Sequence, residues 1–229
     1  MYQIHGPTTL RRLMVLIATL AGLLTIPGVA RADELALWNF NDMDVIVDRG
    51  AGTLTTTANV ANVGFSSGLS LLAQMGDPAG SSLAIQSSRN NGSILDLHVS
   101  TVGFDAIGIQ VAFQRNATGF NYIAMQYSID GFNFISLVST NGVNQEPTEG
   151  SISFDFNAPA VVANQPIFTV RFIIDGASDA NGLIRLDNIL ISGTPTAAPE
   201  PATLLLMATG LFGAVAARRR RRILISKHE

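Results

Sequence analysis

Apolar and polar residues alternate with a period of two over several short segments in the middle of the chain. Ile107, Ile109, Val111 and Phe113 fall on one side of such a segment, with glycine, alanine and glutamine between them. Residues 123–129 repeat the alternation. Because successive side chains of a β-strand point to opposite faces, this pattern predicts strands with one buried face.

Turn-forming residues separate the predicted strands. Further strands are expected at residues 35–40, 53–58, 83–87, 94–99, 151–156, 168–174 and 183–192. The sequence YSIDGFNF, residues 127–134, is expected to form a tight hairpin around Asp130 and Gly131. About nine short strands predict an all-β fold, an antiparallel β-sandwich that is jelly-roll-like, with a barrel as the alternative.

The first 32 residues have the layout of a secretory signal peptide. Two arginines precede the apolar stretch 13–26, and the small-residue pattern Ala-Arg-Ala occupies 30–32. This order predicts a signal peptide at 1–32 that is cleaved before Asp33. An uncleaved N-terminal anchor is the alternative, although the apolar stretch is short for a membrane span.

The C-terminal part of the chain has the features of a membrane anchor. Residues 202–217 carry no charge, and as a helix they would be about 24 Å long, barely enough for a hydrocarbon core of about 30 Å. Five arginines follow this run: Arg218, Arg219, Arg220, Arg221 and Arg222. Positive loops stay on the side from which a chain is inserted, so we predict a transmembrane helix at 202–217 and a basic cytoplasmic tail at 218–229. The sandwich would then occupy 33–193, and 194–201 would be a linker.

Composition narrows the range of functions. Between the two ends the chain has 15 acidic and five basic residues, a balance of about −10, which repels phosphate backbones and argues against nucleic-acid binding. The chain has no cysteine, which excludes disulfides, thiolate nucleophiles and cysteine-based zinc sites.

Residues that would support enzymatic chemistry are few in the predicted sandwich. His98 is its one histidine, and no His-Glu-x-x-His run for zinc is present. Several acids, such as Asp130 and Asp175, stand beside glycine or asparagine, and Asp179 stands two residues before Asn181; aspartate in such places commonly caps a turn. We therefore expect a protein that is not an enzyme, with a secreted glycoside hydrolase or esterase as a less favoured alternative.

Pro199, Glu200 and Pro201, followed by the apolar run and the arginine cluster, resemble the bacterial PEP-CTERM sorting signal. That resemblance implies a Gram-negative bacterium and transient residence in the inner membrane. It also implies an exosortase-type membrane protease that cleaves at or near the Pro-Glu-Pro motif. The mature form would then reach the cell surface or the extracellular polysaccharide matrix. A plain single-pass anchor is the alternative, and the extension ILISKHE after the arginines departs from the usual family pattern.

The segments LALWNFN, QYSIDGFNF and FTVRFIIDGASDANGLIRLDNILISG resemble exported jelly-roll modules, broadly of the galactose-binding or carbohydrate-binding kind. This resemblance implies exopolysaccharide as a possible partner. Tyr122 and Tyr127 are then candidates for a sugar-stacking platform, whereas Trp38 is expected to fill the core.

The same resemblance implies a structural calcium site in which an acid of the last strand joins oxygens near the first strand. Asp187 and Asp42 are its candidate ligands, with Asn188, Asn41 and Asp44 nearby. The alternative for Asp187 and Asn188 is a bulge or a hydrogen-bonded aspartate at the sandwich edge, without metal or any other cofactor.

Overall fold

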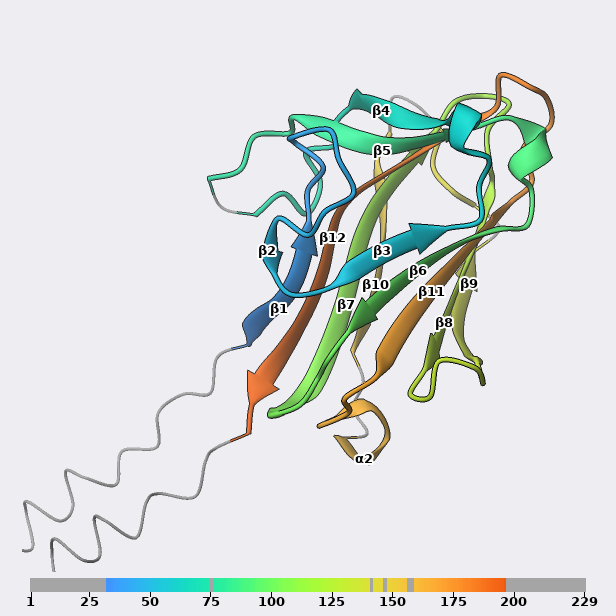
Figure 1. The fold of residues 1–229 in the computed structure, drawn as a ribbon. Coiled ribbons are helices and arrows are strands. Elements are labelled where there is room, and N and C mark those ends of the chain that lie inside the picture. The colour runs from blue at the N-terminus through green and yellow to red at the C-terminus, as the bar shows by residue number, and fades with distance from the viewer. Residues whose placement is uncertain (1–31, 75, 141, 146–147, 156–158, 197–229) are drawn as a thin grey trace, which may run out of the picture. The chain divides into compact units, whose positions relative to one another are not determined.

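The computed structural model describes residues 32–74, 76–140, 142–145, 148–155 and 159–196. These residues form twelve strands, the short helix α2 and two 3₁₀ turns (Figure 1). The strands are β1 (Asp33–Trp38), β2 (Arg49–Gly50), β3 (Thr53–Thr56), β4 (Val63–Ser67), β5 (Ser81–Gln86), β6 (Ser93–Val99), β7 (Phe104–Arg115), β8 (Tyr122–Ser128), β9 (Ile135–Thr140), β10 (Gly150–Asp155), β11 (Phe168–Asp175) and β12 (Leu183–Pro195). The helical elements are η1 (Val60–Asn62), η2 (Ser88–Asn90) and α2 (Pro159–Val162).

The strands form two sheets that pack face to face. The larger sheet has seven strands in the order β10-β7-β12-β1-β2, with β5 paired to β12 and β4 paired to β5. The smaller sheet has five strands in the order β3-β6-β11-β8-β9. All pairs between these strands are antiparallel. The all-β, two-sheet antiparallel sandwich expected from the sequence is therefore confirmed.

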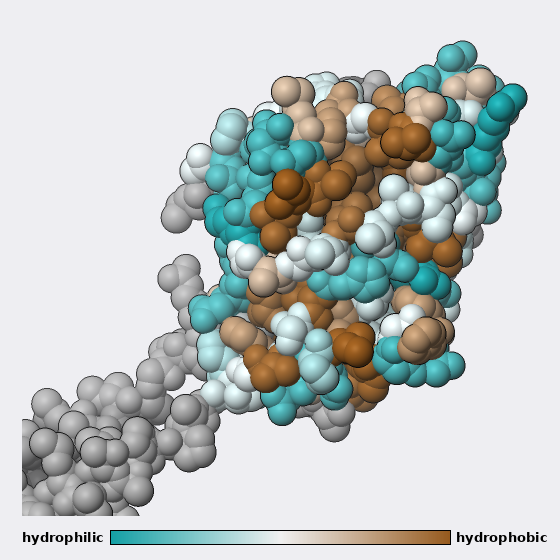
Figure 2. All heavy atoms as spheres, in the orientation of Figure 1, coloured by the Kyte–Doolittle hydropathy of each residue, from teal (hydrophilic) through white to brown (hydrophobic). Residues whose placement is uncertain are grey.

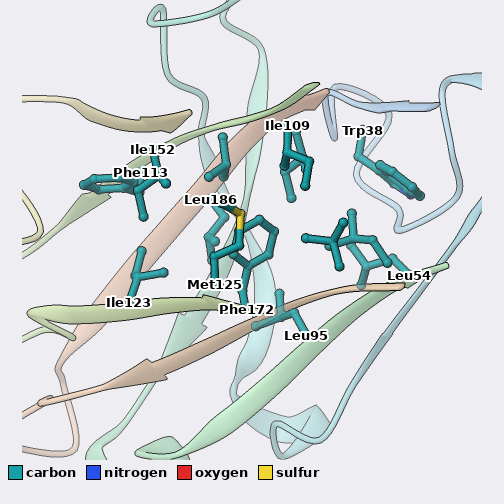
Figure 3. Close-up of a cluster of buried hydrophobic side chains, with 14 of the residues drawn as sticks. Trp38, Leu54, Leu95, Ile109, Phe113, Ile123, Met125, Ile152, Phe172 and Leu186 are labelled. Carbon is teal, nitrogen blue, oxygen red and sulfur yellow. The ribbon is translucent and has the colours of Figure 1, made fainter. Parts of the chain in front are cut away.

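The core lies between the two sheets and is built by the predicted alternation. In β7, Ile107, Ile109, Val111 and Phe113 are all at most 4% exposed. They face residues such as Met125 and Phe172 of the smaller sheet, as Figure 3 shows for part of this cluster. Removal of this apolar surface from water is the main stabilising contribution to a chain without disulfides.

The predicted tight hairpin at residues 127–134 is wrong in its extent. Strand β8 ends at Ser128 and β9 begins only at Ile135, so Ile129 leaves the predicted strand face and is 40% exposed. The reason is Asp130, whose carboxylate accepts hydrogen bonds from the backbone N–H groups of Phe132 and Asn133 at 2.9 and 2.8 Å. These bonds hold residues 129–134 in a longer loop, and β8 and β9 pair as a hairpin only from Tyr127 and Ile135 outward.

Two predicted segments of the chain fall outside the described residues: the signal peptide at 1–32, apart from residue 32, and the helix at 202–217. Among the residues that are described, no helix has the length and apolar character that a membrane crossing requires.

Candidate functional site

The outer face of the five-stranded sheet carries a compact polar cluster. Arg171 of β11 lies in register with Asp96 of β6 on one side and with Gln126 of β8 on the other. The guanidinium of Arg171 donates two parallel hydrogen bonds to Asp96, from Nε at 2.8 Å and from Nη2 at 2.7 Å. Because both side chains are less than a quarter exposed, this bidentate pair is more rigid than an ordinary surface ion pair.

An aromatic ring covers this ion pair. Phe134, from the loop between β8 and β9, places its ring centroid 3.4 Å from Cζ of Arg171. The hydrogen bonds to Asp96 raise the pKa of Arg171, so the guanidinium under the ring stays charged. A cation below a half-buried aromatic ring leaves the opposite ring face directed away from the sheet, which is the geometry of a small stacking platform.

An open groove of about 370 Å³ lies toward one end of the same sheet. Its walls come from residues 51–53, 98–100 and 166–168, which include the end of β6 and the start of β11. His98 is exposed at this groove, and its Nδ1 shares a hydrogen bond of 3.0 Å with the Thr169 hydroxyl. The described part of this sheet thus combines an aromatic ring, an ion pair and further hydrogen-bonding groups on one side.

The aromatic residues singled out from the sequence have different positions. Trp38 is fully buried in the core, as expected, whereas Tyr127 is only 8% exposed and belongs to the same core cluster. Tyr127 is therefore wrong as a stacking residue, because its position in β8 points between the sheets. Tyr122, at the start of β8, is half-buried. Phe134 was missed, although an apolar residue inside a polar turn was a usable signal.

The second cluster surrounds Asp187 in β12. The register of β12 against β7 shifts between Asp187 and Leu190, and Asn188 has a φ of +50°. These features define a β-bulge that turns both polar side chains away from the core. The bulge that the sequence analysis named as an alternative is therefore what the structure contains.

Asp187 and Asn188 hold the loop that follows β4. The Asp187 carboxylate accepts hydrogen bonds from the N–H groups of Leu69 at 2.7 Å and of its neighbour Asn188 at 2.8 Å. The Asn188 amide donates to the carbonyls of Leu69 and Leu71, both at 3.0 Å. Glu149 binds the same loop through the Leu71 N–H at 2.8 Å. Three side chains from two distant segments thus fix residues 69–71 over the outer face of the larger sheet.

Burial perturbs the Asp187 carboxyl. The residue is 1% exposed, and this desolvation is the main cause that raises its pKa from 3.8 to about 7. The two backbone hydrogen bonds oppose the shift, and the negative charges of Glu149 and Asp48 add to it. A buried carboxyl that titrates near neutral pH makes the packing of the Leu69 loop sensitive to pH.

The calcium ligands implied by the resemblance are not arranged as an oxygen cage. Both Asp187 oxygens face N–H donors, and the side-chain amide oxygen of Asn41, Oδ1, accepts from the Ser81 N–H at 2.9 Å. Asp42 is exposed, and Asp44 accepts a hydrogen bond from the Ile46 N–H at 2.7 Å. Within the described ranges, no three acidic or histidine side chains group around a common point. Calcium needs six to eight oxygens, so these residues do not fit the ion as they stand.

The turn aspartates have the structural roles that the sequence analysis expected. Asp130 accepts four hydrogen bonds within its own loop, which hold its pKa well below the ordinary value. Asp175 accepts a hydrogen bond from the Gly176 N–H, and Asp179 accepts one from the Asn181 N–H. These carboxylates are thus engaged in turns.

The described chain ends in hydrogen-bonded structure. Beyond β12, the backbone N–H and the hydroxyl of Thr196 both donate to the carbonyl of Gly103, at 2.8 and 3.0 Å. The sorting-motif residues Pro199, Glu200 and Pro201 and the cluster Arg218 to Arg222 lie outside the described residues.

These features define the class of protein: a two-sheet antiparallel β-sandwich with a polar, aromatic-capped sheet face. Residues 197–222 match the family model of the PEP-CTERM protein-sorting motif. The chain therefore carries this sorting motif at its C-terminus. The motif implies export of the protein, processing by an exosortase and sorting to the cell surface.

Solved structures with a similar arrangement of strands include the K1 cleaved adhesin domain of Lys-gingipain from Porphyromonas gingivalis W83. It has 11% identity and a TM-score of 0.46, over 72% of this chain and 99% of that chain. The CBM22-1 xylan-binding domain of Xyn10C from Paenibacillus barcinonensis has 11% identity and a TM-score of 0.43, over 74% and 100%. TmCBM61 in complex with β-1,4-galactotriose has 11% identity and a TM-score of 0.45, over 67% and 92%. No curated protein matches the chain.

Proposed function

We propose that the chain is an exported, non-enzymatic protein of the cell surface or extracellular matrix. In this proposal residues 1–32 are a cleaved signal peptide, the sandwich is related to jelly rolls, and residues 202–217 hold the precursor in the inner membrane. Arg218 to Arg222 keep the tail on the cytoplasmic side. An exosortase-type protease then removes the tail at or near Pro199–Pro201. The observation that carries the proposal is the match of residues 197–222 to the sorting motif.

The position of this motif in the fold supports the proposal. Strand β12 is paired along its length with β7, β1 and β5, and its hydrogen-bonded structure continues to Thr196. The motif therefore follows a finished domain, and removal of residues after it leaves every described strand intact. Processing would release the sandwich without unfolding it.

Intact mass spectrometry of the surface and secreted fractions tests the processing. The expected mature mass lacks residues 1–32 and the arginine cluster, and replacement of Glu200 by Ala is expected to leave the precursor in the membrane fraction. A surface form that retains Arg218 to Arg222 would refute the proposal.

A second candidate function is glycan binding at the outer face of the five-stranded sheet. The specific observation that favours it is Phe134 stacked on the rigid Arg171–Asp96 pair. An exposed ring face beside fixed charged and amide groups suits a sugar, because the ring stacks on C–H groups while the polar groups bind hydroxyls.

The loop that carries Phe134 provides its own control. Phe132 is 87% exposed in the same loop, and the ring over Arg171 is that of Phe134. Phe134→Ala is expected to abolish retention on polysaccharide extracted from the producing cell, and Phe132→Ala is expected to preserve it. Equal retention of both variants, or no retention of the unsubstituted protein, would refute this second function.

A further inference from the structure

The sorting motif begins very close to the folded sandwich. Thr196 is bound to Gly103 by two hydrogen bonds, and Pro199 follows only three residues later. Three fully extended residues span at most about 10 Å. Any protein that binds Pro199 must therefore come within about 10 Å of Thr196, and so close to the Gly103 carbonyl that Thr196 contacts.

The surface at this place is rigid. It is formed by residues 100–103, before β7, and residues 163–167, before β11. The Thr101 N–H donates to the Gln165 carbonyl, and the Gln165 N–H donates to the Thr101 hydroxyl. The Gly103 N–H donates to the Asn164 side chain at 2.9 Å. Thr101 also donates to the Val162 carbonyl at 2.6 Å. The two loops thus form one cross-linked end of the sandwich, which we call the tail-proximal end.

The tail-proximal end exposes apolar side chains. Val102 is 53% exposed and Ile167 is 50% exposed, and Ile167 also lines the groove beside His98. Figure 2, in the orientation of Figure 1, shows hydrophobic residues at the surface on the side where β1 begins and β12 ends. Two acids accompany them, because Asp33 pairs with Gly193 and Asp105 pairs with Thr194 near the end of β12.

We propose that the tail-proximal end is a docking surface for the membrane protease that processes the sorting motif. The inference rests on the proposed processing near Pro199 to Pro201. Its partner is identified by chemistry: a surface with an apolar centre that receives Val102 and Ile167 and a basic rim that faces Asp105.

The short connection makes such docking effective. A protease that holds the motif brings its own surface against the tail-proximal end, so contact there adds binding energy without a new encounter. A rigid end also loses little conformational freedom on binding. The sandwich end then helps to position the motif.

Substitutions at the tail-proximal end test the inference in the full-length chain. An epitope inside the sandwich is followed by pulse–chase in the producing cell, and the precursor is distinguished from the processed form by mass. Val102→Glu and Ile167→Glu are each expected to slow the conversion about tenfold, the size typical for loss of a buried interface anchor. Val60→Glu is the matched control, because Val60 is 85% exposed in η1 at the opposite end.

The opposite position of Val60 follows from its neighbours. The Asn59 N–H binds the side chain of Asn90, which precedes the start of β6, whereas residues 100–103 follow the end of β6. Thermal unfolding of each purified precursor verifies the fold, and Val102→Ser and Ile167→Ser replace the glutamates where those variants unfold. Conversion of the folded variants at the unsubstituted rate would overturn the inference.

An inserted spacer distinguishes docking of the protease on the tail-proximal end from obstruction of the protease by that end, and it leaves the sandwich unchanged. Several Gly-Ser units inserted between Ala197 and Ala198 move the motif away from the tail-proximal end but keep its distance to residues 202–217. Docking predicts slower conversion, because the two contacts become uncoupled. Faster conversion would show that the sandwich end only obstructs the protease and would overturn the inference. If the unsubstituted chain is never processed, the proposed function fails together with the inference; if it is processed and all variants match it, only the inference fails.

Discussion

Protonation of Asp187 makes the stability of the sandwich depend on pH in a direction that is unusual for an aspartate. In the folded chain its pKa is raised to about 7, mainly by burial, against 3.8 when the chain is unfolded. Between these values the folded state holds a proton that the unfolded state has released. The stability is therefore highest at the acidic end of this window and falls as the pH rises from about 4 to about 7.

The size of this effect follows from the shift. One pKa unit corresponds to about 1.4 kcal/mol, so the free energy of unfolding loses up to about 4 kcal/mol between pH 4 and pH 7 through this group. Replacement by Asn removes the titration but leaves one acceptor for two donors, the N–H groups of Leu69 and Asn188. The protonated carboxyl likewise has only one unprotonated oxygen for these donors, so the amide differs from it by a small amount that does not depend on pH.

Urea unfolding of a protein that comprises residues 33–196 measures the effect at constant ionic strength. The difference in free energy between the unsubstituted protein and Asp187→Asn is expected to decrease steadily from pH 4 to pH 7 and to stay constant above. Asp130→Asn is the control with the opposite sign. Its pKa is lowered by hydrogen bonds, so the stability that it contributes is present above pH 4 and is lost on acidification. Parallel curves for the unsubstituted protein and Asp187→Asn would refute the assignment of a near-neutral pKa.

Three further predictions concern stability and ligands. Gly50→Ala is expected to destabilise the protein by more than the roughly 1 to 3 kcal/mol typical of a strained backbone, because Gly50 has a φ of +79° and a Cβ there would clash with the Leu35 carbonyl oxygen. Thermal unfolding measures this loss. Asp96→Asn is expected to lower the free energy of unfolding by about 1 to 3 kcal/mol. It is also expected to weaken the stacking of Phe134 on Arg171, which near-ultraviolet circular dichroism of the folded protein measures. Millimolar calcium is expected to shift the melting temperature no more than sodium chloride of equal ionic strength, and a shift that disappears in Asp187→Asn would instead establish the calcium site.

The two-sheet fold could be predicted because the two faces of its strands differ in composition. Each face of β7 has a distinct composition, so the residues at 107, 109, 111 and 113 reveal the core without tertiary information. Strand β4 was missed because its sequence, VGFSS, contains glycine and serines and alternates only weakly. It exists because β5 offers a partner edge, and that partner is invisible in a local pattern.

The candidate sites were predicted only in part, for a similar reason. Asp187 could be found, because two polar residues in an apolar strand violate the expected pattern. Its partner, the backbone of Leu69, is 118 residues away along the chain, and no local signal connects them. The platform of Phe134 on Arg171 likewise depends on how a loop folds back over a strand that is 37 residues later.

The order of the strands couples the completion of the fold to the exposure of the sorting motif. Strand β12 is the last strand in the sequence, yet it lies between β7 and β1 in the larger sheet and also pairs with β5. Without β12 these three strands lose their shared partner, so the sheet cannot close until residues 183–195 are in place. Residues 197–222 follow at once. A protease that requires the tail-proximal end would therefore act on chains whose last strand is already in place, because Thr196 reaches Gly103 only after β12 has paired with β7.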